Sequence, residues 1–267
     1  MPGGTDRTYR SVIRGGRALL RALQITVRSS GEEGVPTDGP VVLAANHVSF
    51  PDFLFVARAL LDRRLVRFMC RADVWDTPLP GKLVGRGMAA MRHIPVDRAA
   101  PAAAYLQARS LLREGEAVCV FPEGGISTAY VVRALMPGAV ALARETGAPL
   151  VPVSIWGSQR IWAQRQALDA PVPTPDLTRG RTVDVRFHEP LRVPPGADLV
   201  DTTRRLGHLL QDGLELLQRS PGHRPRPGEY APWHPAHLGG HARDRLESFA
   251  LDGMPTSAVA PTWGPLT

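Results

Sequence analysis

The sequence predicts an α/β domain in which helices flank a single sheet of parallel or mixed strands. Short apolar runs of strand length alternate with longer segments of helical periodicity through the middle of the chain. Gly147, directly after a helical segment, supplies one clear helix stop. The chain has 267 residues, of which 43% are hydrophobic. This length and composition suit one such domain with extensions at its ends.

Each element follows from local periodicity and from the residues at its boundaries. The expected strands span residues 41–45, 66–69, 93–96, 117–121, 150–155 and 183–187. The last of these shows the apolar–polar alternation of an edge strand. The expected helices span residues 51–62, 79–86, 101–113, 137–146 and 199–218.

Residues 1–34 form a basic N-terminal segment. Residues 1–30 contain six arginines against Asp6, so they hold +5 of the formal net charge of +7. On a helical wheel, apolar residues share one side and arginines the other: Val12, Ile13, Leu19, Leu20, Leu23 and Val27 against Arg10, Arg14, Arg17, Arg21 and Arg28. Such an amphipathic helix fits an anionic membrane surface. The alternative is a helix packed on its own domain with a solvated arginine face.

The most informative motif, Asn46-His47-Val48-Ser49-Phe50-Pro51-Asp52, follows the first predicted strand. Residues five apart on a regular helix point about 140° away from each other. Pro51, however, favours the first helical position, so His47 would lie on the preceding turn and fold back towards Asp52. A carboxylate on one ring nitrogen fixes the tautomer of an imidazole, and an imidazole suits general-base chemistry. The alternative is a loop histidine beside a first-turn carboxylate that only stabilises the helix dipole.

Two later apolar runs also end in polar residues. The predicted strand 117–121 leads into Pro122-Glu123-Gly124-Gly125, and open α/β sheets place ligands at such strand ends. The run Met91–Arg98 ends in a charged pair, and the guanidinium of Arg98 offers a donor fork for a phosphate.

Four ordered blocks resemble the glycerophospholipid acyltransferase family, which includes the 1-acylglycerol-3-phosphate acyltransferases. Asn46–Asp52 is similar to the family's first block, Asn-His-x-Ser-x-x-Asp, and Ile94–Arg98 is similar to the second, which ends in an arginine. Phe121–Gly124 matches the start of the third block, and Val151–Ile155 is similar to the fourth. The resemblance covers roughly residues 35–215. We therefore expect an acyltransferase domain over residues 35–219.

The resemblance implies transfer of a fatty acyl group from a thioester, either acyl-CoA or acyl-ACP, to the hydroxyl of a lysophospholipid. The expected acceptor is 1-acylglycerol-3-phosphate and the product phosphatidic acid. His47 would act as the general base and Asp52 would hold the imidazole, with no covalent acyl-enzyme. Substrate binding falls to Arg98, Glu123, Gly124 and Gly125, with Glu123 either organising its turn or touching the acceptor. Backbone N–H groups of the glycine turn, or of the helix start near Pro51, are the candidate oxyanion donors.

The third block departs from the family pattern. The family usually continues with Thr-Arg-Ser, whereas this chain has Gly125-Ile126-Ser127. The family arginine is associated with the acceptor's phosphate, so Arg133 and Arg98 become the candidates for the missing charge. Another lysolipid or a glycolipid is therefore an alternative acceptor, and a catalytically silent, membrane-associated lipid-binding protein is an alternative function. A hydrolase is less well supported, because the chain has no Gly-x-Ser-x-Gly elbow.

Composition also constrains partners and location. Cys70 and Cys119 have neither metal-site spacing nor a disulfide framework, which fits a reducing compartment. No apolar stretch reaches the roughly 18 residues of a membrane span, and no signal-peptide pattern appears. We expect a peripheral protein on the cytoplasmic face of the cell membrane. Its expected partners are the lysolipid, acyl-CoA or acyl carrier protein, and an anionic membrane surface, with no cofactor, metal or nucleic acid.

The C-terminal segment, residues 220–267, is rich in Pro, Gly and His and has little periodicity. This composition predicts a disordered or loosely attached tail. Its histidines lack a regular ligand spacing, which argues against a dedicated metal site: His223, His234, His237 and His241.

Overall fold

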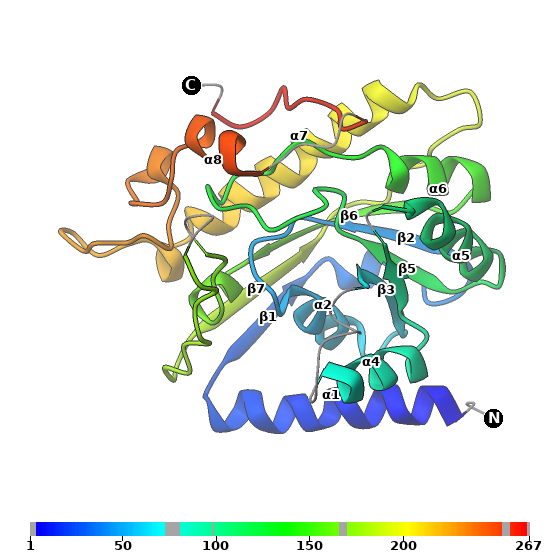
Figure 1. Cartoon of the computed structure of the whole chain (residues 1–267), viewed down its shortest axis with the longest axis horizontal. Helices are drawn as coiled ribbons and strands as arrows, with labels where there is room; N and C mark the ends of the chain where they lie inside the picture. The colour runs from blue at the N-terminus through cyan, green and yellow to red at the C-terminus, as the bar shows by residue number, and fades with distance from the viewer. Residues whose placement is uncertain (1–3, 73–80, 98, 166–169, 253–256, 266–267) are drawn as a thin grey trace.

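The computed structural model describes residues 4–72, 81–97, 99–165, 170–252 and 257–265. Within these residues, seven strands form one sheet in the order β1-β7-β6-β2-β5-β3-β4 (Figure 1). Neighbouring strands are parallel except β6 and β7, which run antiparallel. The sheet is therefore mixed. The strands are β1 Thr26–Ser30, β2 Val41–Ala45, β3 Val66–Arg71, β4 Ile94–Val96, β5 Ala117–Val120, β6 Leu150–Trp156 and β7 Thr182–Phe187.

Helices cover both faces of the sheet. They are α1 Gly4–Ala22, α2 Asp52–Leu60, α4 Gly81–Ala90, α5 Pro101–Arg113, α6 Gly138–Thr146, α7 Leu199–Gln218 and α8 Arg245–Asp252. Alternate residues of β2 point to opposite faces, so Val42 and Ala44 join the core under α5, α6 and α7, while Val41 and Leu43 join the core beside α1, α2 and α4. Figure 1 shows these two helical layers on either side of the sheet. The predicted α/β fold with helices flanking one sheet is confirmed.

The central strands place their carboxyl ends at one edge of the sheet. β2 lies between β5 and β6 and runs parallel to both. The loops that follow these three strands begin at Asn46, Phe121 and Gly157. This is the edge at which open α/β sheets bind their ligands. The three loops build the site described below.

Two sequence expectations about the edge of the sheet are corrected. β7 is not an edge strand, because it pairs with β6 on one side and with β1 on the other. The N-terminal helix ends at Ala22, and residues 26–30 form β1 instead of a continuation of the helix. The run Ile25-Thr26-Val27 is β-branched, which favours extended backbone once a partner strand is present. Residues 26–30 thus belong to the sheet, not to a separate N-terminal segment.

The helix α1 packs on its own domain through part of its apolar side. Tyr9 and Ile13 are buried, and the Tyr9 hydroxyl donates a hydrogen bond of 3.0 Å to the carbonyl oxygen of Val66. Val12 and Leu19, which share the predicted apolar side, are 44% and 59% exposed. The helix therefore anchors on the domain and still presents apolar side chains at the surface. Among the described residues, no helix is long and apolar enough to cross a membrane.

The C-terminal segment differs from the predicted disordered tail. Its described residues include α8 and two short 3-10 helices, and they pack against α7 and the loop before α6. Trp263 is 2% exposed and its indole N–H donates to the carbonyl oxygen of Val132 at 3.0 Å. Gly207 on α7 makes room for this ring, because an added Cβ would lie 2.4 Å from it. Single large side chains among turns hold this segment, and such packing leaves no periodic signal in the sequence.

Candidate active site

The loop after β2 brings His47 and Asp52 together as the sequence predicts. Pro51 caps the start of α2, and Asp52 is the first helical residue. His47 Nδ1 lies 2.8 Å from Asp52 Oδ2. Because the carboxylate accepts, the network assigns the proton to Nδ1 and leaves Nε2 as the basic nitrogen. The His47 ring stacks on Phe121 with centroids 4.3 Å apart, and its side chain keeps 19% exposure. An imidazole that is held in place by a carboxylate and a neighbouring ring, and that remains partly exposed, suits proton transfer.

Asp52 is fully buried and satisfied by neutral donors besides the imidazole. Its Oδ2 accepts from the backbone N–H groups of Val48 at 2.8 Å and Ser49 at 2.9 Å. Its Oδ1 accepts from the Ser158 hydroxyl at 2.5 Å. These donors hold the carboxylate in place and stabilise its negative charge in a site without water contact. Among the residues that the structure describes, the imidazole of His47 is the one group bonded to Asp52 that can carry a positive charge.

Glu123 connects the loop after β5 to the loop that carries His47. One carboxylate oxygen accepts from the backbone N–H of His47 at 2.6 Å, and the other accepts from the backbone N–H of Arg133 at 2.8 Å. The Ser127 N–H in turn donates to the His47 carbonyl oxygen at 2.9 Å. Glu123 is 2% exposed. Of the two roles that the sequence left open for Glu123, these contacts favour organising the turn.

The glycines of the third block form a tight turn that contacts Arg133. Gly124 has φ of +64°, a conformation that favours glycine, and its N–H donates to the Phe121 carbonyl oxygen at 3.1 Å. A Cβ added to Gly125 would lie 2.3 Å from Arg133 Nη1. The guanidinium of Arg133 thus fills the space that a side chain at position 125 would take. Ile126 is buried, so it points away from solvent. Arg98, the remaining predicted substrate-binding residue, lies outside the described residues.

Sequence reasoning missed Ser158, which holds Asp52 from the far side. Besides donating to Asp52, Ser158 accepts through its carbonyl oxygen from the Ser49 hydroxyl at 3.0 Å. Asn46 ties the same two loops together, because its side chain exchanges hydrogen bonds with the backbone of Ile155 at 2.6 and 3.1 Å. A signal for Ser158 was present. Ser158 follows the strand that carries the fourth block, and the carboxyl ends of parallel strands lie at the same edge of the sheet.

Comparison with known proteins relates part of this chain to acyltransferases. A family model described as "Acyltransferase" matches residues 26–156. The 1-acyl-sn-glycerol-3-phosphate acyltransferase of Bacillus subtilis (strain 168) is 28% identical over 140 residues, which cover 52% of this chain and 67% of that protein. A chloroplastic 1-acyl-sn-glycerol-3-phosphate acyltransferase of Arabidopsis thaliana is 25% identical over 169 residues, or 62% of this chain and 43% of that protein. An uncharacterized protein of Mycobacterium tuberculosis (strain H37Rv) is 32% identical over 175 residues, or 60% of this chain and 45% of that protein.

A solved structure shares the fold. The crystal structure of the 1-acyl-sn-glycerophosphate acyltransferase PlsC from Thermotoga maritima superposes with a TM-score of 0.61 at 22% identity, and the match covers 79% of this chain and 80% of that one. The fold and the four matched blocks define an acyltransferase domain. Over residues 26–156 the chain matches the acyltransferase family model, and in this region it is similar to the 1-acyl-sn-glycerol-3-phosphate acyltransferases. It spans about two thirds of the Bacillus relative and less than half of the plant and mycobacterial relatives named here.

Proposed function

We propose that this protein transfers a fatty acyl group from an acyl thioester to the hydroxyl of 1-acylglycerol-3-phosphate, giving phosphatidic acid. The observation that carries this proposal is the 2.8 Å contact between His47 Nδ1 and the buried Asp52 carboxylate, which leaves Nε2 of a partly exposed imidazole as the base. The names of the Bacillus and plant relatives support the same acceptor. The acyl donor is acyl-CoA or acyl-ACP, and the chain needs no other cofactor.

The acyl group passes directly from the thioester to the acceptor hydroxyl. His47 Nε2 takes the proton of the acceptor hydroxyl as its oxygen attacks the thioester carbonyl, and Asp52 stabilises the imidazolium that forms. The tetrahedral intermediate collapses by breaking the C–S bond, and the imidazolium returns its proton to the leaving thiolate. An ester and a free thiol result. No acyl group is attached to the protein at any stage.

The backbone N–H of Gly125 is the oxyanion donor that we infer. The N–H groups of Val48 and Ser49, before the start of α2, are already used by Asp52, and the N–H of Gly124 is used by Phe121. Among the described residues, the Gly125 N–H makes no hydrogen bond. It lies in the loop that Glu123 ties to His47, so it is held close to the reacting carbonyl.

Arg133 is our candidate for the acceptor phosphate. Its backbone N–H donates to the same carboxylate that accepts from His47, and its guanidinium packs on Gly125 at the position where the family pattern has a threonine. A planar guanidinium binds phosphate oxygens in a bidentate manner. In this chain, where Gly125 and Ile126 replace the family's threonine and arginine, the guanidinium at the turn comes from Arg133. If Arg133 does not serve this role, a lysolipid or glycolipid without a phosphomonoester is the second candidate acceptor.

Binding to an anionic membrane at the cytoplasmic face is part of the proposal. The exposed side chains Val12 and Leu19 lie on α1 together with exposed arginines, which include Arg14 and Arg21. Burial of the apolar side chains and attraction of the arginines to acidic lipids add to each other. A peripheral position would bring the site to the lysolipid without a spanning helix.

An acceptor panel with one radiolabelled acyl thioester tests the function. The wild-type protein should acylate 1-acylglycerol-3-phosphate best, and His47→Ala should lower kcat by about 10³-fold, the contribution typical of a general base. His208→Ala, which removes an exposed histidine on α7, is the matched control and should keep full activity. An unchanged rate in His47→Ala would contradict the proposal and favour the silent lipid-binding alternative.

The same panel tests Arg133. Arg133→Ala should raise KM for 1-acylglycerol-3-phosphate by about tenfold and leave KM for monoacylglycerol unchanged, since a charge-assisted hydrogen bond is lost only for the phosphate acceptor. Gly125→Thr should act in the same direction by displacing the guanidinium. Equal effects on both acceptors would assign Arg133 a purely structural role. In the Arg133→Ala protein, adding Ile126→Arg should restore the preference for 1-acylglycerol-3-phosphate over monoacylglycerol.

A further inference from the structure

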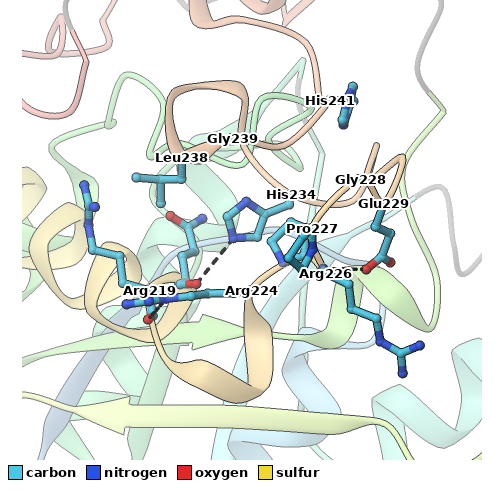
Figure 2. Close-up of a pocket in the computed structure, with 12 residues that line it drawn as sticks. Arg219, Arg224, Arg226, Pro227, Gly228, Glu229, His234, Leu238, Gly239 and His241 are labelled. Atoms are coloured by element: carbon cyan, nitrogen blue, oxygen red, sulfur yellow. Dashed lines mark hydrogen bonds between the residues drawn. The ribbon is translucent and has the colours of Figure 1, made fainter.

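A cavity lies outside the loops of the candidate active site, between the end of α7 and the C-terminal segment (Figure 2). Its volume is about 600 Å³, within the range of about 300–1,000 Å³ that small-molecule sites occupy. The described residues that carry its charged and aromatic groups are Arg219, Arg224, Arg226, Glu229, His234 and His241. The family model ends at residue 156, so this cavity belongs to a part of the chain that the model does not match.

The cavity wall is joined to two of the three loops of the candidate active site, those after β5 and β6. Gln218, at the end of α7, lines the cavity and donates through its side chain to the carbonyl oxygen of Tyr130 at 2.8 Å, in the loop that continues from Glu123. Gln159 donates to the carbonyl oxygen of Trp233 at 3.2 Å, and the neighbouring Ser158 is the residue that holds Asp52. The cavity and His47 thus sit at the same edge of the sheet.

The charge of the cavity is positive. Its lining contains three arginines and Glu229, and Figure 2 shows the arginines at the end of α7 and on the loop that follows. Arg219 pairs with Glu215 of α7 at 3.1 Å, which leaves Arg224 and Arg226 as the arginines that concern a ligand. Glu229 is used locally, because it accepts from the backbone N–H of Arg226 at 2.9 Å. Arg224 Nε donates to the Arg219 carbonyl oxygen at 2.5 Å. Among the described residues, the terminal nitrogens of Arg224 and Arg226 make no hydrogen bond or ion pair, so they are available to an anion.

Aromatic and imidazole groups accompany the arginines. Tyr230 is 74% exposed, and its ring lies 4.9 Å from the ring of His241. His234 is buried, and its Nε2 donates to the Gln218 carbonyl oxygen at 3.3 Å. Its Nδ1 is therefore an acceptor, and this buried atom has no hydrogen-bond partner among the described residues.

We propose that this cavity binds the nucleotide phosphates of a coenzyme A thioester, with Arg224 and Arg226 on the phosphates and the Tyr230–His241 pair beside the base. Guanidinium groups bind phosphate oxygens, and aromatic rings stack on purine faces. Because the pantetheine arm separates the thioester from the nucleotide, the donor needs a phosphate site set apart from His47. This inference rests on the proposed acyl transfer, and it selects acyl-CoA over acyl-ACP as the donor.

Binding of adenosine 3′,5′-bisphosphate, measured by calorimetry, tests the site without catalysis. We expect binding to wild-type protein and to His47→Ala alike. Arg224→Ala and Arg226→Ala should each weaken it by about fivefold or more, and Tyr230→Ala by a smaller factor. Arg192→Ala, which removes an exposed arginine outside the cavity, is the matched control and should bind as wild type. Absence of binding to the wild type, or equal binding by the Arg224→Ala/Arg226→Ala double variant, would overturn the proposal.

Donor kinetics separate this proposal from the proposed function. The two arginine substitutions should raise KM for a long-chain acyl-CoA and leave kcat unchanged, while KM for the same acyl group on pantetheine, which lacks the nucleotide, stays the same. If only acyl-ACP serves as donor, the nucleotide assignment is wrong although acyl transfer stands. If neither donor is used while adenosine 3′,5′-bisphosphate still binds, the transfer reaction fails and the nucleotide site remains. Thermal unfolding of each variant shows that the fold is kept.

Discussion

Two histidine–aspartate pairs in this protein have the same chemistry and different surroundings. His47 Nδ1 lies 2.8 Å from Asp52, and the histidine side chain is 19% exposed. His223 Nε2 lies 2.5 Å from Asp184, and the histidine side chain is 2% exposed. Arg28 also contacts Asp184 with two hydrogen bonds of 2.6 Å. The first pair joins the loop after β2 to the start of α2, and the second joins β1, β7 and the C-terminal segment.

The difference is the reason why we propose His47–Asp52 as the catalytic pair and assign His223–Asp184 a structural role. Asp184 already has a guanidinium as its counter-charge, and its histidine has little access to solvent or ligand. Within the described part of the chain, the donors to Asp52 other than the imidazole are neutral, so its charge is available to stabilise an imidazolium. Its histidine uses Nδ1 for the carboxylate and leaves the outer nitrogen for a substrate. Counter-charge and access, not the distance between the two residues, distinguish the pairs.

The largest expected effect comes from exchanging one carboxylate of each pair for an amide. Asp52→Asn should lower kcat by about 10³-fold, because the imidazole loses the partner that fixes its tautomer and stabilises its charged form. Steady-state transfer of a radiolabelled acyl group measures the change. Asp184→Asn is the matched variant and should keep kcat per folded molecule. Similar losses of kcat in both variants would contradict the assignment of His47–Asp52 as the catalytic pair and His223–Asp184 as a structural one.

The buried pair should matter for stability. His223→Ala removes a side chain that fills the contact between Asp184 and the C-terminal segment, and we expect it to lower the free energy of unfolding by about 2 kcal/mol. Urea denaturation followed by circular dichroism measures this. His47→Ala, at the partly exposed member of the other pair, should change the free energy of unfolding by less than about 1 kcal/mol. The reverse order of these two losses would contradict the assignment.

Ser158→Ala tests how Asp52 is held beside His47. The Ser158 hydroxyl donates to Asp52 Oδ1, so its loss should let the carboxylate shift and reduce kcat by about fivefold, with little change in KM. Ser158→Thr keeps a hydroxyl and should recover part of the rate. Ser29→Ala, which removes an exposed hydroxyl bonded to Glu32, is the control. If kcat in Ser158→Ala equals that of Ser29→Ala, Ser158 does not position Asp52.

Acid should weaken the structural pair. Burial acts to raise the pKa of Asp184, but the hydrogen bonds from His223 and Arg28 outweigh it, so the pKa in the folded protein is lower than the ordinary value. The stabilisation is therefore complete above the unfolded-state pKa of about 4 and is lost as pH falls through the folded-state pKa. Urea midpoints of wild type and Asp184→Asn, measured from pH 5 to pH 2, should converge towards low pH. Curves that stay parallel would show that Asp184 does not contribute.

Local sequence signals predicted most of the fold. The central strands and the helices around them appear close to their expected positions, because each has its own periodicity and a clear boundary such as Gly147. The strand at residues 26–30 was missed because it follows directly on a helix whose apolar period can be extended through Val27. The packing of the C-terminal segment was missed because Trp263 and His234 are single buried residues among turns.

The His47–Asp52 pair could be predicted because every atom that builds it lies within six consecutive residues. Pro51 fixes the start of the helix, and the turn before it returns the imidazole to the carboxylate. The family resemblance of the same stretch named the chemistry. By itself, therefore, the sequence determined the α/β class, the contact between His47 and Asp52, and the resemblance to acyltransferases.

Only the tertiary structure decided how that pair is held and what surrounds it. Ser158 reaches Asp52 from 106 residues away, Glu123 reaches the His47 backbone from 76 residues away, and Arg133 fills the space beside Gly125. These contacts depend on the order of strands in the sheet, which brings the ends of β2, β5 and β6 to one edge. No local periodicity encodes strand order, because it arises from packing between segments distant in the chain.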